Sequence, residues 1–344
     1  GRAVSETDSN LQPTQPPAAP AGELSIAELR DLRRVSPWRA PVDIGITWIV
    51  IVAVLVLLAV RPAWWTLLLA APVLGALQNR LTTLLHDAMH RSLHPKPKVS
   101  DFWGKWLCAY PCGNFFHINL IMHRNHHHEF GLQRDPNVLA YTVSRKTFLT
   151  RDLPKSLFAL GLFSALLNFN QKLANRFRYS EKQAAVQDAD RNLKKEALRK
   201  DYVRLPLVQL TLMGGAFVSG FWWLYFYWVA TRITFCATFN SVRLFVEHHS
   251  DLSDAHPILA NTADPHDPDN PVLVNMSVGL LERFFIAPLH FNLHGTHHVA
   301  PFIPYYQLPE ITEIIRERGL KYCLTRRGYV SYLLGRENFE EEEK

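Results

Sequence analysis

Residues 44–90 read IGITWIVIVAVLVLLAVRPAWWTLLLAAPVLGALQNRLTTLLHDAMH, and this stretch decides the fold. It begins with an uncharged run at 44–60, which would extend about 25 Å as a helix, close to the minimum for crossing a bilayer. Arg61-Pro62 then predicts a tight turn, and two tryptophans typical of a membrane interface open a second apolar segment at 64–85. We therefore expect a hairpin of two membrane-spanning helices.

Basic residues flank this hairpin on both sides. They are Arg30, Arg33, Arg34 and Arg39 before the first span, and Arg91, Lys96, Lys98 and Lys105 after the second. Positively charged residues beside membrane spans are enriched on the cytoplasmic side. Both ends of the hairpin are therefore expected to face the cytoplasm.

A second apolar region, 205–246, has Arg232 and Arg243 as its charged residues. It is too long for one crossing and suits two, at about 205–220 and 223–246, with a turn near Gly220. Arg232 is difficult to place, because a charged side chain inside a span is costly. The sequence thus predicts an all-α integral membrane protein with four transmembrane helices and a cytoplasmic helical cap.

The remaining segments divide the chain further. Residues 1–22 lack the basic start and apolar stretch of a signal peptide and predict a disordered tail. We expect an interfacial amphipathic helix at 23–41, a membrane domain over 42–310, and a cytoplasmic segment with an acidic tail at 311–344. The four scattered cysteines are too few for a secreted disulfide scaffold.

The histidines are the strongest chemical signal, because half of the sixteen fall into three clusters. The clusters are His86-Asp87-Ala88-Met89-His90, His123-Arg124-Asn125-His126-His127 and His294-Gly295-Thr296-His297-His298. Histidines four residues apart share one face of a helix. Imidazole suits iron, zinc and copper, and eight or nine imidazoles are enough for two metal ions. Clusters beside span ends on one side of the membrane favour a shared metal site over an accidental surface tract.

These clusters resemble the three histidine boxes of the membrane fatty acid desaturase and hydroxylase superfamily, whose members hold two iron ions at the cytoplasmic face. The resemblance covers roughly residues 42–310 and includes Asp135-Pro136 after the second box and Asn292 before the third, similar to bacterial acyl desaturases. The first box also looks like that of carotenoid ketolases. The metal ligands that the resemblance implies are His86, His90, His123, His126, His127, His294, His297 and His298.

A ninth ligand is expected at the end of the fourth span, where family members often carry a further histidine. Here Asn240, Leu244 and His248 share one helical face, and Glu247-His248 resembles a pair in bacterial relatives. A ligating imidazole usually donates its other N–H to a carboxylate or carbonyl. The polar neighbours expected to orient the ligands are Asp87, Asp135, Glu247 and Asn292. For Glu247, an ion pair with Arg243 is an equally good interpretation.

The resemblance implies an enzyme that uses dioxygen and two iron ions to oxidise a fatty acyl chain, most simply by introducing a double bond. Breaking an unactivated C–H bond needs an oxidant stronger than any side chain, which a metal that activates dioxygen supplies. We find no haem-binding segment of a fused cytochrome, so electrons are expected from a separate ferredoxin- or cytochrome-type donor. The net charge of +6 suits an acidic donor or anionic lipid headgroups equally well.

Other reactions are compatible with the same scaffold: hydroxylation, carotenoid ketolation, or oxidative decarboxylation to a terminal alkene. A metal transporter or sensor is the alternative outside enzymes, but it would carry ionisable residues inside its spans. The expected partners are the membrane, a lipid or fatty acyl substrate and an electron-donor protein, with no nucleic acid. We expect a bacterial inner membrane as the location, with both termini and the metal site cytoplasmic.

Overall fold

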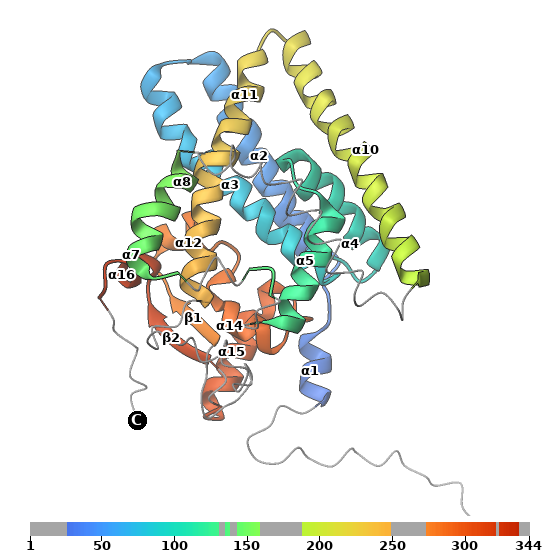
Figure 1. Ribbon diagram of the computed structural model, residues 1–344, viewed down its shortest axis with the longest axis vertical. Helices are drawn as coiled ribbons and strands as arrows, with labels where there is room; N and C mark the ends of the chain where they lie inside the picture. The colour runs from blue at the N-terminus through green and yellow to red at the C-terminus, as the bar shows by residue number, and fades with distance from the viewer. Residues whose placement is uncertain are drawn as a thin grey trace, which may run out of the picture.

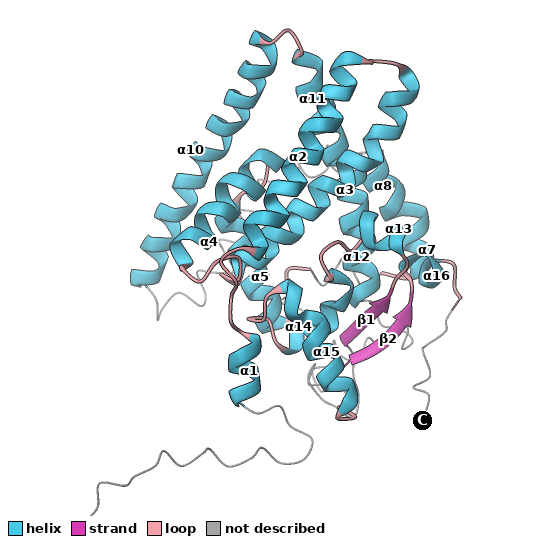
Figure 2. Ribbon diagram, turned by 180° about the vertical axis from the view of Figure 1, so that it is seen from behind, coloured by secondary structure: helices cyan, strands magenta, loops and turns pink. Residues whose placement is uncertain are grey.

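The computed structural model describes residues 26–130, 135–137, 143–158, 188–248, 273–320 and 323–336. The tail predicted at 1–22 and the acidic end of the chain lie outside these residues. The described part of the protein is mostly helical and contains one small sheet (Figures 1 and 2). A short first helix, α1 (Ile26–Leu32), falls in the segment expected to be amphipathic.

Two long helical hairpins form the frame of the molecule. They are α2 (Arg39–Val60) with α3 (Trp64–Met89), and α10 (Asp188–Val218) with α11 (Trp222–Thr231). Gly220 lies in the second turn at φ +79°, a conformation that favours glycine, so the turn predicted there is confirmed. Both turns lie at the same end of the molecule, opposite the strands (Figure 1).

Among the described residues, α2 is the one helix that is both long and apolar enough to cross a membrane. The four expected spans are therefore not confirmed. The apolar run of α3 is interrupted by Gln78, Asn79 and Arg80, and α10 opens with a charged half. The fourth expected span is divided into α11, a π-helical segment η5 (Arg232–Cys236) and α12 (Ala237–His248).

Polar side chains in these helices bind partners on neighbouring elements. Gln78 donates from Nε2 to the carbonyl oxygen of Trp228 at 2.9 Å. Arg232 donates from Nε to the carbonyl oxygen of Cys112 at 3.1 Å and from Nη2 to Oδ1 of Asn114 at 2.9 Å. Such contacts satisfy polar groups that lie in apolar surroundings, and they give Arg232 the partners that the sequence did not reveal.

Shorter helices surround the ends of the hairpins. Those between the hairpins are α4 (Pro97–Trp103), η1 (Gly104–Ala109), η2 (Tyr110–Cys112), α5 (Phe116–Glu129), α7 (Arg145–Thr147), η3 (Phe148–Asp152) and α8 (Leu153–Leu157). Those after α12 are α13 (Leu280–Phe285), η7 (Phe291–Leu293), α14 (His294–Val299), η8 (Tyr305–Gln307), α15 (Leu308–Glu317) and α16 (Tyr329–Leu333). Proline in the first turn starts α4, α8 and α15, where its missing N–H costs no hydrogen bond.

Two short strands show that the expectation of a purely helical protein was wrong. β1 (Leu273–Ser277) and β2 (Cys323–Arg327) pair in parallel, starting with Leu273 opposite Cys323. The pairing joins segments far apart in the chain, and each strand has five residues. A strand this short cannot be told from other apolar runs by its pattern alone, so no local signal predicted it.

β1 supports the helix that carries the third histidine cluster. A Cβ atom added at Gly295 would lie 2.9 Å from backbone atoms of Val274, so this contact between α14 and β1 requires glycine. The Asn275 side chain accepts from the N–H of Thr296 at 3.0 Å and donates to its Oγ1 at 2.9 Å. The strand thus explains why glycine and threonine separate the histidines of this cluster.

Candidate metal centre

All nine histidines predicted as ligands lie together, where the ends of α3, α5 and α12 meet α14 (Figure 1). They form two groups, within each of which the ligand atoms lie within 4.8 Å of one another. The five-histidine group comprises His86, His90, His123, His127 and His297. The four-histidine group comprises His126, His248, His294 and His298.

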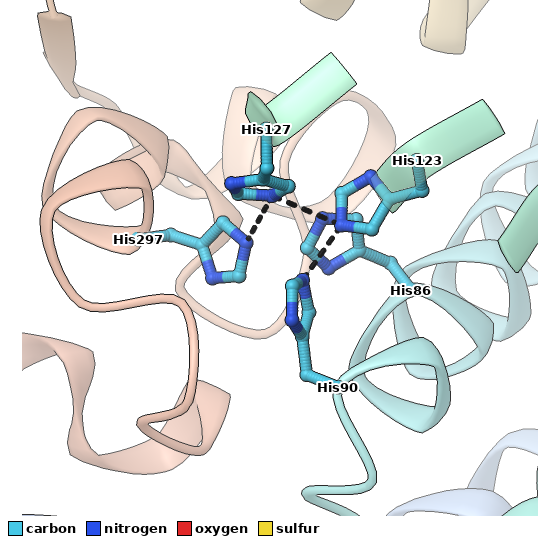
Figure 3. A group of neighbouring side chains, drawn as sticks. All are labelled: His86, His90, His123, His127 and His297. Atoms are coloured by element: carbon cyan, nitrogen blue, oxygen red, sulfur yellow. Dashed lines mark hydrogen bonds between the residues drawn. The ribbon is translucent and has the colours of Figure 1, made fainter. Parts of the chain in front are cut away.

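The rings of the five-histidine group face a common centre (Figure 3). The Nε2 atom of His123 lies 2.6 Å from Nε2 of His90 and 3.0 Å from Nε2 of His127. Nε2 of His127 lies 3.3 Å from Nε2 of His297. The ring of His86 closes the group, with its centroid 4.2 Å from that of His123.

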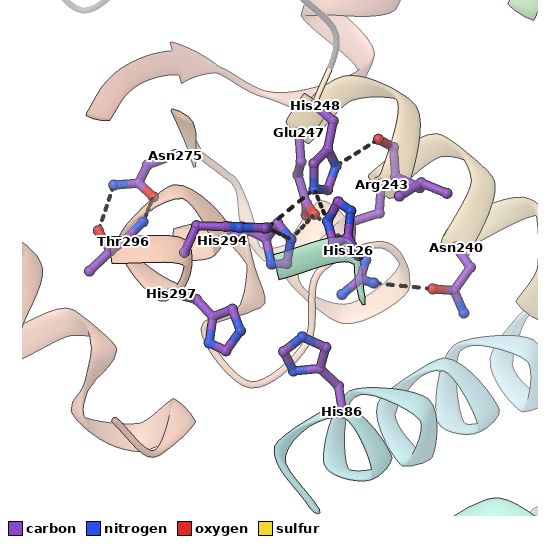
Figure 4. A network of polar contacts seen from close by, with 12 residues as sticks. His86, His126, Asn240, Arg243, Glu247, His248, Asn275, His294, Thr296 and His297 are labelled. Carbon is purple, nitrogen blue, oxygen red and sulfur yellow. Dashed lines mark hydrogen bonds and ion pairs between the residues drawn. The ribbon is translucent and has the colours of Figure 1, made fainter. Parts of the chain in front are cut away.

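The four-histidine group is similar in its spacing but lies fully inside the protein. Nε2 of His248 lies 3.1 Å from Nε2 of His126 and 3.4 Å from Nε2 of His298. Nε2 of His298 lies 3.1 Å from Nε2 of His294. All four residues are buried, whereas three members of the five-histidine group are only partly buried. Figure 4 shows His126, His248 and His294 turned toward one another.

These distances fit cation binding better than a hydrogen-bond network. Each nitrogen of a neutral imidazole either carries a proton or offers a lone pair, but not both. An Nε2 atom that faces two other Nε2 atoms can therefore not form ordinary hydrogen bonds to both of them unless both have the opposite protonation. Metal–imidazole bonds of about 2.0–2.1 Å would separate neighbouring nitrogens by about 3.0–3.4 Å, which matches the observed spacing of every pair above except His90 and His123. Both ring nitrogens of His86 are buried and have no hydrogen-bond partner among the described residues. The donor set therefore fits two metal ions.

Burial lowers the pKa of seven of the nine imidazoles and so favours their neutral form. It is the main cause that lowers the pKa of His90 to about 4. The histidines whose pKa is lowered well below the ordinary value by burial, and then by neighbouring imidazoles, are His86, His123, His248, His294, His297 and His298. Because a metal ion needs the lone pair of a neutral ring, both groups are ready to bind at neutral pH.

Two rings of the four-histidine group are held by partners on their Nδ1 atoms. Both carboxylate oxygens of the buried Asp135 lie 2.9 Å from Nδ1 of His126. Nδ1 of His248 lies 2.9 Å from the carbonyl oxygen of Leu244. A carbonyl oxygen only accepts, so Nδ1 of His248 carries the proton and its Nε2 lone pair is directed at the other rings.

Asp87 and Asn292 contact backbone and hydroxyl groups near the rings. Asp87 accepts from the N–H of Tyr305 at 2.9 Å and from the Ser92 hydroxyl at 3.1 Å, while its nearest approach to Nδ1 of His86 is 3.7 Å. Asn292 donates from Nδ2 to the carbonyl oxygen of Met276, at 2.8 Å. Asp87 thus links the end of α3 to the segment before α15, and Asn292 links the segment before α14 to β1.

Glu247 combines the two contacts that the sequence left as alternatives. Its Oε2 atom lies 3.9 Å from Nε of Arg243 and also 3.9 Å from Nε2 of His294. Its Oε1 atom accepts a hydrogen bond of 2.7 Å from the Tyr329 hydroxyl. Burial raises the pKa of Glu247 to about 8, against the opposing effects of Arg243 and Tyr329.

Several residues at the centre were not found from the sequence. Tyr329, on α16, donates to Glu247, and Asn275, on β1, binds Thr296. Neither residue is next to a histidine cluster in the chain. His117 pairs with Asp201, with Nδ1 2.8 Å from Oδ1. His128 is exposed beside the second cluster.

Comparisons with known proteins agree with this geometry. The family model described as fatty acid desaturase matches residues 62–330, which is more than half of the chain. The chain is also similar to dihydrorhizobitoxine desaturase from Bradyrhizobium elkanii. The two are 24% identical over 275 residues, which cover 77% of this chain and 72% of the relative.

Proposed function

The chain belongs to the fatty acid desaturase family and is a desaturase-like enzyme, and we propose that it uses two iron ions and dioxygen to oxidise a fatty acyl chain. Introduction of a double bond is the reaction we favour. The observation that carries the proposal is the convergence of nine imidazoles into two groups of suitable spacing. The five- and four-histidine groups would each hold one iron ion, which when bound supplies the dioxygen chemistry that side chains lack.

The protein's own residues would prepare this chemistry in two ways. Burial favours the neutral form of seven of the rings, and Asp135 and the Leu244 carbonyl fix the orientation of His126 and His248. All four residues of the four-histidine group are buried, which would limit the access of water to that side of the centre. Neutral, oriented and buried rings suit an oxidation whose reactive species must be kept from water.

We further propose that the helical hairpins lie in a bilayer, with the metal centre at its cytoplasmic rim. Only 22% of the most apolar window of α2 is buried inside the protein. Val218 is 92% exposed and Trp64 is 77% exposed, both close to the hairpin turns. Large exposed apolar surfaces of this kind are unusual in soluble monomers and suit lipid. We propose a bacterial inner membrane as the location, and the basic residues that flank the first hairpin support cytoplasmic termini.

Electrons would come from a separate ferredoxin- or cytochrome-type protein. Three residues of the five-histidine group support an access route from water, because His90, His123 and His127 are only partly buried. Basic residues follow α3 directly, where Arg91, Lys96 and Lys98 precede or open α4. An acidic donor would be attracted to this side of the protein.

A purified protein grown with ample iron tests the proposal. We expect about two iron ions per chain, as nine imidazoles at four or five per ion require. Mass spectrometry of lipids from a host with and without the protein identifies the reaction. Loss of two hydrogens indicates desaturation, gain of one oxygen indicates hydroxylation or the first step of ketolation, and loss of the carboxyl group indicates alkene formation. A protein that binds zinc alone, or no metal, would refute the enzyme proposal in favour of a transporter, sensor or structural site.

A further inference from the structure

Arg243, near the end of α12, is a cation with an incomplete set of partners beside the metal centre. Its side chain is 12% exposed. Within the described part of the chain, its Nε and Nη1 atoms are buried and have no hydrogen-bond acceptor. Its Nη2 atom donates a long hydrogen bond of 3.3 Å to Oδ1 of Asn240. Buried guanidinium groups normally have their donors satisfied, so this one has capacity for a further acceptor.

The position of Arg243 relates it directly to the metal centre. The same Oε2 atom of Glu247 lies 3.9 Å from Nε of Arg243 and 3.9 Å from Nε2 of His294. The two nitrogens are therefore no further apart than twice that distance. The guanidinium also lies 3.8 Å above the ring of Phe291, which contacts His86 at a centroid distance of 4.6 Å. Figure 4 shows Arg243 and Glu247 beside the four-histidine group.

The charges around Arg243 call for an anion. A guanidinium beside residues that would hold two metal cations experiences repulsion, which is strong in buried surroundings. Glu247 supplies one carboxylate, but one of its oxygens is already bound to Tyr329. The unpartnered Nε and Nη1 atoms lie on different edges of the guanidinium, and each can donate a charge-assisted hydrogen bond to a carboxylate oxygen.

We propose that Arg243 binds the carboxylate of the substrate. The substrate is then a free carboxylic acid rather than an ester or thioester, and the C–H bond that is oxidised lies within the first few carbons of the carboxyl group. This inference rests on the proposed function, and it narrows the substrate class and the position of oxidation. Arg243 is in this sense a residue that determines specificity.

A purely structural role is the competing explanation, since Arg243 also stacks on Phe291 and approaches Glu247. Arg232 offers a matched control. It lies on the preceding η5 segment, is partly buried, and binds Cys112 and Asn114 rather than the centre. Arg243→Gln and Arg232→Gln therefore remove the same charge from two positions about three turns apart in one helical run.

The experiment compares the binding of dodecanoic acid and methyl dodecanoate to the detergent-solubilised, iron-loaded protein by equilibrium dialysis. The wild type should bind the free acid more tightly, by roughly ten- to hundredfold, as a charge-assisted hydrogen bond allows. Arg243→Gln should lose this preference while it keeps its iron. Arg243→Lys should keep part of it, because the charge remains without the planar fork. Arg232→Gln should keep all of it.

Equal binding of acid and ester by the wild type would overturn the inference, whether or not the variants fold. An unchanged preference in Arg243→Gln would also overturn it and leave Arg243 with a structural role. The position of oxidation gives a second readout, because a product oxidised far from the carboxyl group contradicts the inference but leaves the proposed function intact. Failure of the proposed function is seen separately, as missing iron or missing product.

Discussion

The five-histidine group and the four-histidine group use the same ligand but differ in how the protein holds it. In the four-histidine group all residues are buried, and Asp135 and Leu244 fix two of the rings through Nδ1. In the five-histidine group three residues are only partly buried, and His86 has no fixed partner on either nitrogen among the described residues. The buried group is thus prearranged by the protein, whereas the rings of the other group would be ordered largely by the metal ion itself.

The largest expected effect comes from removing one ligand of either group. His126→Ala and His297→Ala should each abolish product formation and bring the iron content below about two per chain, because each ring belongs to a different group. Iron analysis and product analysis of the purified variants provide the measurement. His128→Ala, an exposed neighbour, should change neither. Normal turnover of His297→Ala would refute the assignment of the site.

The difference in burial predicts an order of metal release. A chelator should remove iron from the five-histidine group first, because His90, His123 and His127 are partly accessible. Activity should therefore disappear while about one iron per chain remains, if two ions act together. Iron content and activity followed over time test this order. Loss of both ions at one rate would show that the two groups do not differ in accessibility.

A carboxylate that orients a ring should matter more than one that does not. Asp135→Asn should lower the metal affinity of the four-histidine group by roughly ten- to hundredfold, since it weakens the support of His126. Asp87→Asn should have a smaller effect, because Asp87 binds Tyr305 and Ser92 instead. Metal titration of the apo variants gives both values. Equal losses would mean that the contact with Nδ1 is not what distinguishes the two residues.

The smallest effect is expected at Tyr329, which supports Glu247 beside the four-histidine group. Tyr329→Phe should lower the free energy of unfolding by about 1 kcal/mol, the usual value of one hydrogen bond. Tyr225→Phe removes a hydrogen bond to Gln209 in the second hairpin and provides the control. Both should lower the thermal stability, but a change in metal binding is expected for Tyr329→Phe alone. The same metal affinity in both variants would limit Tyr329 to a structural role.

Helix geometry explains why the convergence of these histidines was predictable and their division into two groups was not. Residues four apart share a helical face, which keeps His86 with His90 and His123 with His127 in one group. His126 is turned away from that pair and joins the other group. The spacing of histidines along one helix determines which of them share a face of that helix. Which faces of different helices meet depends on tertiary packing, which the sequence of one helix does not show.

The sequence by itself determined the mostly helical fold, the turn at Gly220, the identity of the nine histidines that meet and the family of the enzyme. Each of these follows from spacing, composition or motifs within a short stretch. The tertiary structure alone decided the pairing of β1 with β2, the contact of Gly295 with Val274 and the placement of Arg243 beside Glu247 and Phe291. These features depend on contacts between segments that are far apart in the chain. No pattern within a short stretch of sequence indicates such contacts.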